Sequence, residues 1–379
     1  MSENPAFLKE QIITYLGNKR SLLGLIDEAI SDIKADMKHD KISFADVFSG
    51  SGVVSRLAKK HAKMIFANDL ESYSRIINEC YLSNFTSELE LGILEFHSTL
   101  SKINELKAGF ITELYAPKDD ENIKRAERVF FTRKNAMFID TMRDEISKLP
   151  RVFQKFFIAP LIYEASVHNN TGGVFKGFYK GKNGIGKFGG EKANALGRIK
   201  GEIRLKMPVF SNFSCDFAVS QKDAADFAKD CERVDIAYFD PPYNEHPHGS
   251  NYFMLNLIAQ YKKPKDISEV SGIPKEWNKS VYNKKAKAKE SFFELLASFK
   301  AKYLLISFNN EGYISRAEFE AFGAKIGKLN IIEQKYNSKS TKKSEVSECQ
   351  IQTKILPELY KDIYKIHFFS FLELDMLHT

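Results

Sequence analysis

The stretch Tyr238-Phe239-Asp240-Pro241-Pro242-Tyr243 decides the fold, because it marks the end of a buried strand. Residues 234–239 form a mainly apolar run, which stops at an acid, two prolines and a tyrosine. Proline has no amide hydrogen, so neither Pro241 nor Pro242 can extend the hydrogen-bond ladder of a sheet. In α/β proteins, ligands bind at the carboxyl ends of the strands. We therefore expect this stiff corner to border a ligand site. The alternative is a plain turn that terminates a strand.

The corner offers a specific set of chemical groups. Asp240 contributes a carboxylate, the prolines leave carbonyl oxygens without ladder partners, and Tyr243 has a flat face for stacking. Two hydrogen-bond acceptors beside an aromatic plate suit a planar heterocycle with an exocyclic amino group. We expect Asp240, Pro241, Pro242 and Tyr243 to contact such a ligand.

The composition limits the class of protein. The chain has 379 residues, of which 43% are hydrophobic, and a formal net charge of +7. This length predicts one large domain with a second module. No apolar run has the length of a membrane span, and the first residues do not resemble a secretory signal, so we expect a cytoplasmic protein. The four cysteines are scattered and have no histidine cluster beside them, which argues against a metal site.

A glycine turn near the N-terminus predicts a second part of the site. Residues 42–48 are a strand candidate, Ser49-Gly50-Ser51-Gly52 follows, and residues 53–60 are a helix candidate. Glycines at such a turn let a ligand approach the backbone closely. The next strand candidate, 64–67, ends in Asn68-Asp69, where the acid can accept hydrogen bonds from ribose hydroxyls. This β-α-β unit predicts a cofactor that contains adenosine, and the absence of a third glycine argues against a dinucleotide.

A long insertion separates this unit from the Asp240 corner. From about residue 74 to 208 the apolar residues recur at helical spacing, which indicates a mainly helical module. Its last part, 171–206, carries nine basic residues and two acidic ones, and ten glycines lie between Gly172 and Gly201. Lysines attract phosphates, while polar and aromatic side chains can reach base edges. We predict a DNA-contacting tract, the alternative being a disordered solvated loop. The predicted contact residues are Asn169, Asn170, Thr171, Phe175, Lys176, Tyr179, Lys180 and Lys182.

The chain then returns to alternating strands and helices. Residues 209–213 are a strand candidate, and we expect Asp216 and Phe217 at its carboxyl end, where they suit an amino group and an aromatic edge. Residues 220–223 have a capping-box pattern that predicts a helix start.

The last part of the chain predicts a hairpin. Strand candidates lie near 303–308, 329–336 and 346–355. The polar loop between the last two contains Lys339 and Lys342, and we predict that this loop covers a bound duplex. Residues 358–379 carry no structural prediction.

Taken together, these motifs resemble those of the Dam-like N6-adenine DNA methyltransferases of the alpha arrangement. Asp240-Pro241-Pro242-Tyr243 is similar to the catalytic tetrapeptide of that family, and Asp216-Phe217 to its adenine-pocket motif. Near the N-terminus, Tyr15-Leu16-Gly17-Asn18-Lys19-Arg20 resembles its first cofactor motif, Phe48-Ser49-Gly50-Ser51-Gly52 its glycine turn, and Asn68-Asp69 its ribose acid. The order matches too, because in that group the target recognition domain lies between the glycine turn and the catalytic motif.

The resemblance implies a doubly wound, Rossmann-like methyltransferase sheet with a reversed hairpin at one edge, and S-adenosyl-L-methionine as the methyl donor. It implies a discontinuous catalytic domain (1–73 and 209–357), an inserted target recognition domain (74–208) and an extension (358–379). The implied partners are double-stranded DNA and a cognate restriction endonuclease encoded nearby, with the enzyme acting as a monomer. The implied cofactor residues are Tyr15, Gly17, Asn18, Lys19, Asp46, Phe48, Ser49, Gly50, Gly52, Asp69, Asp216, Phe217 and Asp240.

The predicted reaction is methyl transfer to N6 of an adenine turned out of duplex DNA. N6 is a poor nucleophile because its lone pair is delocalised into the ring. Hydrogen bonds from N6 to the Asp240 carboxylate and the Pro241 carbonyl would stabilise the charge that develops on attack, and Tyr243 would stack on the extruded base. The alternatives are methylation of adenine in RNA or of cytosine N4 in DNA, or a non-catalytic nucleic-acid-binding protein. No metal is needed.

Overall fold

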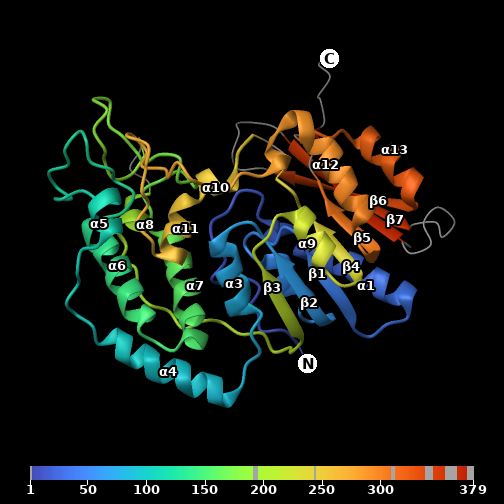
Figure 1. Cartoon of the computed structure of the whole chain (residues 1–379), viewed down its shortest axis with the longest axis horizontal. Helices are drawn as coiled ribbons and strands as arrows, with labels where there is room; N and C mark the ends of the chain where they lie inside the picture. The colour runs from blue at the N-terminus through green and yellow to red at the C-terminus, as the bar shows by residue number, and fades with distance from the viewer. Residues whose placement is uncertain are drawn as a thin grey trace.

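The computed structural model describes residues 2–190, 195–242, 245–308, 312–337, 345–354 and 365–373, and side chains as far as residue 332. A lobe built on a β-sheet lies beside a lobe of helices, and α10 lies between them (Figure 1). Both Tyr243 of the predicted tetrapeptide and the loop residues Lys339 and Lys342 lie outside the described residues.

In the described part of the chain, eight strands form one sheet in the order β3-β2-β1-β4-β5-β7-β6-β8. The five neighbouring strands β3, β2, β1, β4 and β5 are parallel to one another, whereas β6 and β7 form an antiparallel hairpin. This confirms the predicted Rossmann-like sheet with a reversed hairpin. The strands are β1 (Ile42–Asp46), β2 (Ala62–Asn68), β3 (Asp216–Ser220), β4 (Val234–Phe239), β5 (Ala301–Ser307), β6 (Lys328–Asn337), β7 (Glu345–Lys354) and β8 (Lys365–Glu373).

Helices cover both faces of the sheet. Alternate residues of β4 face opposite sides: Ile236 packs in the cluster that contains α1 and α2, whereas Ala237 packs with α9, α12 and α13. The sheet-lobe helices are η1 (Lys19–Leu22), α1 (Leu23–Met37), α2 (Val53–Ala58), α3 (Ser72–Tyr81), α9 (Ala224–Asp230), α10 (His248–Asn251), η2 (Val281–Asn283), α12 (Lys285–Ser298) and α13 (Arg316–Ile326).

The second lobe is helical, as the periodicity of the insertion predicts. Its helices are α4 (Ser87–Ser101), α5 (Phe110–Tyr115), α6 (Arg133–Ser147), α7 (Arg151–Val167), α8 (Leu196–Lys200) and α11 (Phe253–Gln260). Among the described residues, no helix has the length and apolar character that crossing a membrane requires.

Helix α11 belongs to the helical lobe although it follows the Asp240 corner in sequence. Its apolar side chains lie in the same buried cluster as those of α6 and α7. Arg143 of α6 donates from Nε to the carbonyl of Ile258 at 2.7 Å, and the Tyr115 hydroxyl donates to the carbonyl of Gly272 at 2.8 Å. The range 209–357, predicted as catalytic domain, therefore contains a segment that packs on the predicted recognition domain.

The expected strand at 209–213 is wrong, because these residues hydrogen-bond to the N-terminal segment instead of to the sheet. The Val209 amide donates to the Gln11 side chain at 3.2 Å, and the Asn4 side chain donates to the carbonyl of Phe210 at 2.9 Å. The neighbouring strand begins only at Asp216. The predicted capping box is also displaced, since the side chain that caps α9 is that of Asp223.

Candidate active site

The Asp240 corner lies at the carboxyl end of β4, between β1 and β5. Strand β4 ends at Phe239, as predicted, and the Val47 amide donates to the carbonyl of Tyr238 at 3.0 Å, which fixes the neighbouring end of β1. One carboxylate oxygen of Asp240, Oδ2, lies 2.9 Å from Lys19 Nζ. The other, Oδ1, is buried and has no hydrogen-bond partner among the described residues. One oxygen of the acid is thus held in place while the other remains available to a donor.

Burial and Lys19 act in opposite directions on the Asp240 carboxyl. Burial raises its pKa above the usual aspartate value, and the ammonium group of Lys19 lowers it. The net direction is upward. Without Lys19 the carboxyl group would hold its proton more strongly still.

The first predicted cofactor motif delivers Lys19 to this corner. The Asn18 side chain accepts a hydrogen bond from the Arg20 amide at 2.8 Å and so caps the short helix η1. Gly17 has φ +74°, and its carbonyl accepts a hydrogen bond from Lys19 Nζ at 2.9 Å. Because Lys19 is only 4% exposed, its ammonium group is confined between this carbonyl and Asp240.

The glycine turn is held against the predicted ribose acid. The Gly50 amide donates to Asp69 Oδ2 at 2.7 Å, and burial raises the pKa of the Asp69 carboxyl. Gly50 has φ +50°, and a Cβ placed on it would lie 3.1 Å from a ring carbon of Tyr15. Gly52 (φ +74°) starts α2, and the Ser49 hydroxyl is used within the scaffold, where it donates to a β2 carbonyl. The turn therefore requires glycine both for its conformation and for space.

Asp46 is a second buried acid at this edge of the sheet. It is the last residue of β1 and is 1% exposed, and the Ser55 hydroxyl donates to its Oδ2 at 2.6 Å. Burial raises the pKa of Asp46 to about 7. Its Oδ1 has no hydrogen-bond partner among the described residues. A buried carboxyl oxygen without a partner costs free energy, so the site suits a ligand that supplies a donor.

An aromatic cluster beside the turn joins the predicted cofactor residue Tyr15 to Tyr73, His248 and Tyr252, which the sequence motifs do not predict. The Tyr15 ring stacks on that of Tyr252, with centroids 4.7 Å apart, and its hydroxyl lies 2.6 Å from His248 Nδ1. The Tyr73 hydroxyl donates to that of Tyr15 at 3.3 Å. Burial and the nearby charge of Lys19 lower the pKa of His248 to about 4, so the imidazole is neutral at pH 7. The segment after the catalytic corner thus supports Tyr15 directly.

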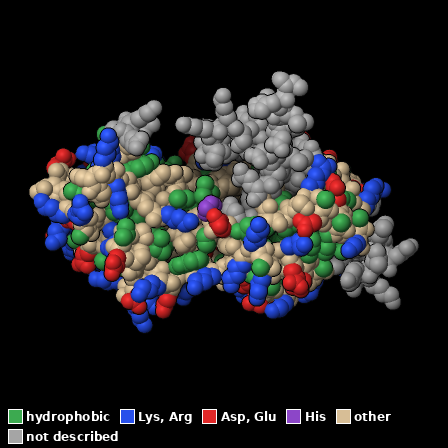
Figure 2. Space-filling view, turned by 90° about the horizontal axis from the view of Figure 1, so that it is seen from above, with side chains coloured by type: hydrophobic (Ala, Val, Ile, Leu, Met, Phe, Trp, Pro, Cys, Tyr) green, Lys and Arg blue, Asp and Glu red, His purple; other side chains and the backbone are tan. Residues whose placement is uncertain are grey.

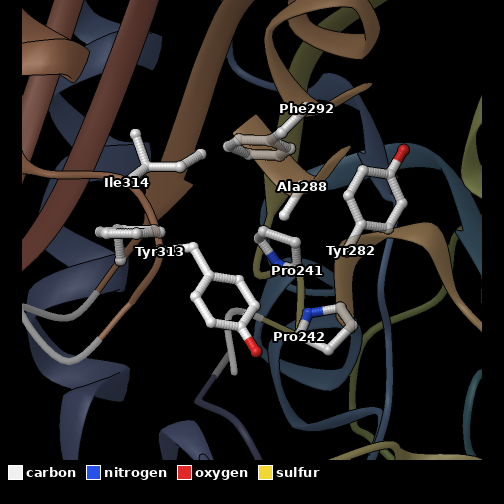
Figure 3. Close-up of a pocket in the computed structure, with 8 residues that line it drawn as sticks. Pro241, Pro242, Tyr282, Ala288, Phe292, Tyr313 and Ile314 are labelled. Atoms are coloured by element: carbon white, nitrogen blue, oxygen red, sulfur yellow. The ribbon is translucent and has the colours of Figure 1, made fainter. Parts of the chain in front are cut away.

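On its other side, the corner borders a small cavity lined mainly by aromatic and apolar side chains (Figure 3). Pro241 and Pro242 form one wall, and Tyr282 lies across from them. Phe48 of the glycine turn packs edge to face on Tyr282, with centroids 5.2 Å apart, so the cavity adjoins the turn. The remaining lining residues are Ala288, Phe292, Phe308, Tyr313 and Ile314. Isolated apolar residues of this kind give no functional signal in a sequence.

The structure places Asp216 and Phe217 away from this edge, which corrects their predicted position. They begin β3 instead of following a strand, and Asp216 pairs with Met64 near the start of β2. The carboxyl end of β3 is Ser220, whose hydroxyl donates to the Asn68 side chain at 2.8 Å beside Asp69. The residues of β3 that border the site are therefore those around Ser220.

Half of the predicted DNA-contacting tract is buried scaffold. The Asn170 side chain donates to the carbonyls of Val129 and Lys187, at 2.8 and 2.9 Å, and accepts from the Gly189 amide at 3.0 Å. These bonds leave Asn170 no free group for a base. Three other predicted contacts, Asn169, Thr171 and Phe175, are also buried. At the surface, Lys176, Lys180 and Lys182 are exposed and Tyr179 is half-buried.

Comparison with known proteins agrees with this geometry. A family model described as D12 class N6 adenine-specific DNA methyltransferase matches residues 15–322. The chain belongs to this family. It is an adenine-specific DNA methyltransferase, as the order of its motifs predicts.

Named relatives cover almost the whole chain. The D12 methyltransferase is 31% identical over 326 residues to the Type II methyltransferase M.CviAII of Paramecium bursaria Chlorella virus 1, which covers 84% of this chain and 90% of the relative. It is 29% identical over 343 residues to the Type II methyltransferase M.NlaIII of Neisseria lactamica. This match covers 88% of this chain and 94% of the relative. No solved structure matches the chain.

Proposed function

We propose that this D12 methyltransferase takes S-adenosyl-L-methionine as its methyl donor and acts on an adenine extruded from duplex DNA. The observation that carries the proposal is the Asp240 corner, where Oδ1 is buried without a hydrogen-bond partner in the described chain and two sites of different character adjoin the corner. One is the glycine-turn edge with Tyr15, Asp46 and Asp69, and the other is the aromatic cavity beside Pro241.

The glycine-turn edge fits the donor. Gly50 leaves open a space that a Cβ would fill against Tyr15, and Asp46 presents a buried carboxyl oxygen without a partner in the described chain. Asp69 would accept from ribose hydroxyls, and Lys19 would bind the donor's carboxylate beside Asp240. When bound, S-adenosyl-L-methionine supplies an electrophilic methyl group.

The aromatic cavity is the proposed site of the base. A flat purine would pack against Pro242 and the ring of Tyr313, which line the cavity. Its amino group would then be directed at Asp240 Oδ1 and the Pro241 carbonyl. Accepting two hydrogen bonds from N6 favours a pyramidal nitrogen and stabilises its developing positive charge. Extrusion of the base is required because N6 of a stacked, paired adenine cannot reach a donor bound in the protein. Tyr243 completes the catalytic tetrapeptide in this proposal.

Methylation assays with labelled S-adenosyl-L-methionine test the proposal directly. We expect label in duplex DNA as N6-methyladenine at one short sequence, which sequencing of modified DNA from expressing cells would map. The matched negative control is Asp240→Ala. Label confined to RNA, or found on cytosine, would contradict the choice of acceptor, and no label with any nucleic acid would support a non-catalytic binding protein.

The names of the relatives add a biological role. Both M.NlaIII and M.CviAII are Type II methyltransferases. We infer that this enzyme acts as the modification partner of a restriction endonuclease. Cells that carry the enzyme would then hold DNA resistant to a nuclease of the same recognition sequence.

A further inference from the structure

One charged segment beside the aromatic cavity has no role in the site described above. Residues 275–287 connect the helical lobe to α12 and contain one acidic residue, Glu276. Five lysines of this segment are exposed: Lys275, Lys279, Lys284, Lys285 and Lys287. Within the described parts of the chain, none of the five forms an ion pair. The next lysine, Lys289, does so, at 2.9 Å from Glu318.

This segment is anchored to the rest of the protein at Asn278 and borders the cavity at Tyr282. The Asn278 side chain donates to the carbonyl of Leu70 at 2.9 Å and to Glu71 at 3.0 Å. A Cβ on Gly249 would lie 2.4 Å from the Asn278 carbonyl oxygen, which shows how closely α10 and this segment pack. Tyr282 is 3% exposed and forms a cavity wall.

Two of these lysines, Lys284 and Lys285, stand at positions where a positive charge destabilises the protein in the absence of a partner. Lys284 is the N-cap residue of α12 and makes no side-chain capping bond, Lys285 begins the helix, and no acid lies in the first turn. A positive charge at a helix N-terminus is disfavoured because the helix dipole places partial positive charge there. Local choices that oppose stability are common where a chain binds a partner.

On this basis we propose that Lys279, Lys284 and Lys285 contact the DNA phosphates that flank the extruded adenine. The inference rests on the proposed function, and it identifies a DNA-contacting surface outside the predicted recognition domain. A base that enters the cavity carries its own backbone to the rim, and these three lysines lie two or three residues from Tyr282, which lines the cavity. In the view from above, Lys and Arg side chains lie on both lobes, as binding of one duplex across them requires (Figure 2).

The test compares two triple variants of the full chain. Lys279→Gln/Lys284→Gln/Lys285→Gln removes the proposed contacts. Lys9→Gln/Lys63→Gln/Lys102→Gln removes the same charge from exposed lysines elsewhere, Lys63 being near the amino end of β2. Trp277 is the only tryptophan of the chain, and Lys279 Nζ lies 5.7 Å from its ring centre. Because the first variant lacks that ammonium group, the urea midpoint followed by Trp277 emission, and not the emission wavelength itself, reports whether the segment stays folded.

Duplex DNA binding is measured over a range of salt concentrations. We expect the slope of log affinity against log salt concentration to be smaller in magnitude by about 2–3 in the first variant, because each lost phosphate contact reduces that slope by about 0.9. The control variant should keep the wild-type slope. Methyl-donor affinity should be unchanged in both. Equal slopes for the two variants would overturn the inference.

A second measurement locates the contact. Once the modified sequence is mapped, neutral methylphosphonate linkages are placed on either side of the target adenine. They should weaken binding by the wild type and the control variant, and have less effect on the first variant, because the charged partners are already absent. Fully additive losses would overturn the inference. If the inference is overturned but the wild type methylates adenine, the proposed function still stands. If the wild type has no activity on adenine, both the proposed function and the inference are rejected.

Discussion

Lys19 Nζ and Asp240 Oδ2 lie 2.9 Å apart, so the first motif of the chain and the catalytic corner share one buried ion pair. Lys19 is 4% exposed and also donates to the carbonyl of Gly17. Its position prevents the Asp240 carboxylate from turning away from the site. Under the proposed function, this pair would join donor binding to catalysis through a single lysine.

We predict that catalysis requires the negative charge of Asp240. Asp240→Asn keeps the shape of the side chain and removes the charge, and we expect kcat to fall by about 10²–10³-fold, the range measured when one preorganised group at a developing charge is removed. Single-turnover methylation and equilibrium binding of S-adenosyl-L-methionine would measure the two effects separately. Loss of donor affinity equal to the loss of rate would instead indicate a structural role for the acid.

Removing Lys19 should shift the pH dependence of the reaction. Lys19 lowers the pKa of the Asp240 carboxyl against the effect of burial. Lys19→Gln removes that influence, so the pKa of Asp240 rises and the carboxylate is lost at a higher pH as the solution is acidified. We expect the acid limb of the pH profile of kcat to move to higher pH in Lys19→Gln. Lys19→Arg keeps the charge and is the control. An unmoved limb in the glutamine variant would show that Asp240 ionisation does not limit the rate.

Gly50 should tolerate no side chain. Its φ is +50°, and a Cβ would meet the Tyr15 ring at 3.1 Å, so Gly50→Ala strains the turn and displaces an aromatic ring of the donor site. We expect donor affinity to fall by about tenfold or more, since a few kcal/mol of strain and displaced contact are available. Gly24→Ala is the matched control, because Gly24 lies in α1 with no atom within 4 Å of a Cβ. Unchanged donor affinity in Gly50→Ala would place the donor elsewhere.

The main features of the sheet could be predicted because burial in parallel strands follows from residue type. Residues 234–239 are mainly apolar and are followed by an acid and two prolines, so both the strand and its terminus are visible in the sequence. The packing of α11 could not be predicted in the same way. Its apolar surface shows that the helix is buried but does not identify the lobe that covers it.

The recognition tract misled prediction for a different reason. Asparagines among glycines and lysines usually belong to solvated loops. Here the irregular backbone has carbonyls and amides without ladder partners, and the Asn170 side chain satisfies three of them. A sequence does not distinguish an asparagine side chain that contacts a base from one that hydrogen-bonds to backbone groups outside a helix or sheet.

Glu71 should make stability depend on pH. Glu71 is 3% exposed, and burial raises its pKa from 4.5 to about 7. Because the folded protein holds the Glu71 proton more strongly than the unfolded chain does, this proton stabilises the fold. The stabilisation is complete below the pKa that Glu71 has in the unfolded chain, and it is lost as pH rises through about 7. The glutamine of Glu71→Gln cannot ionise. We therefore expect the free energy of unfolding of this variant, relative to that of the wild type, to rise by about 2 kcal/mol between pH 5 and pH 8. Urea unfolding at both pH values measures this, with the exposed Glu276→Gln as control. A pH-independent difference would contradict it.

Asn170 and Lys180 should differ in how they affect DNA binding. Asn170→Ala leaves the carbonyls of Val129 and Lys187 and the Gly189 amide without their partner. We expect the free energy of unfolding to fall by about 3 kcal/mol, at about 1 kcal/mol or more per lost buried bond. Lys180→Gln, at an exposed position, should leave stability unchanged and reduce the salt slope of DNA binding by about 0.9. Urea unfolding and salt titrations measure both. Normal stability of Asn170→Ala with loss of sequence preference would return Asn170 to the role of reading a base.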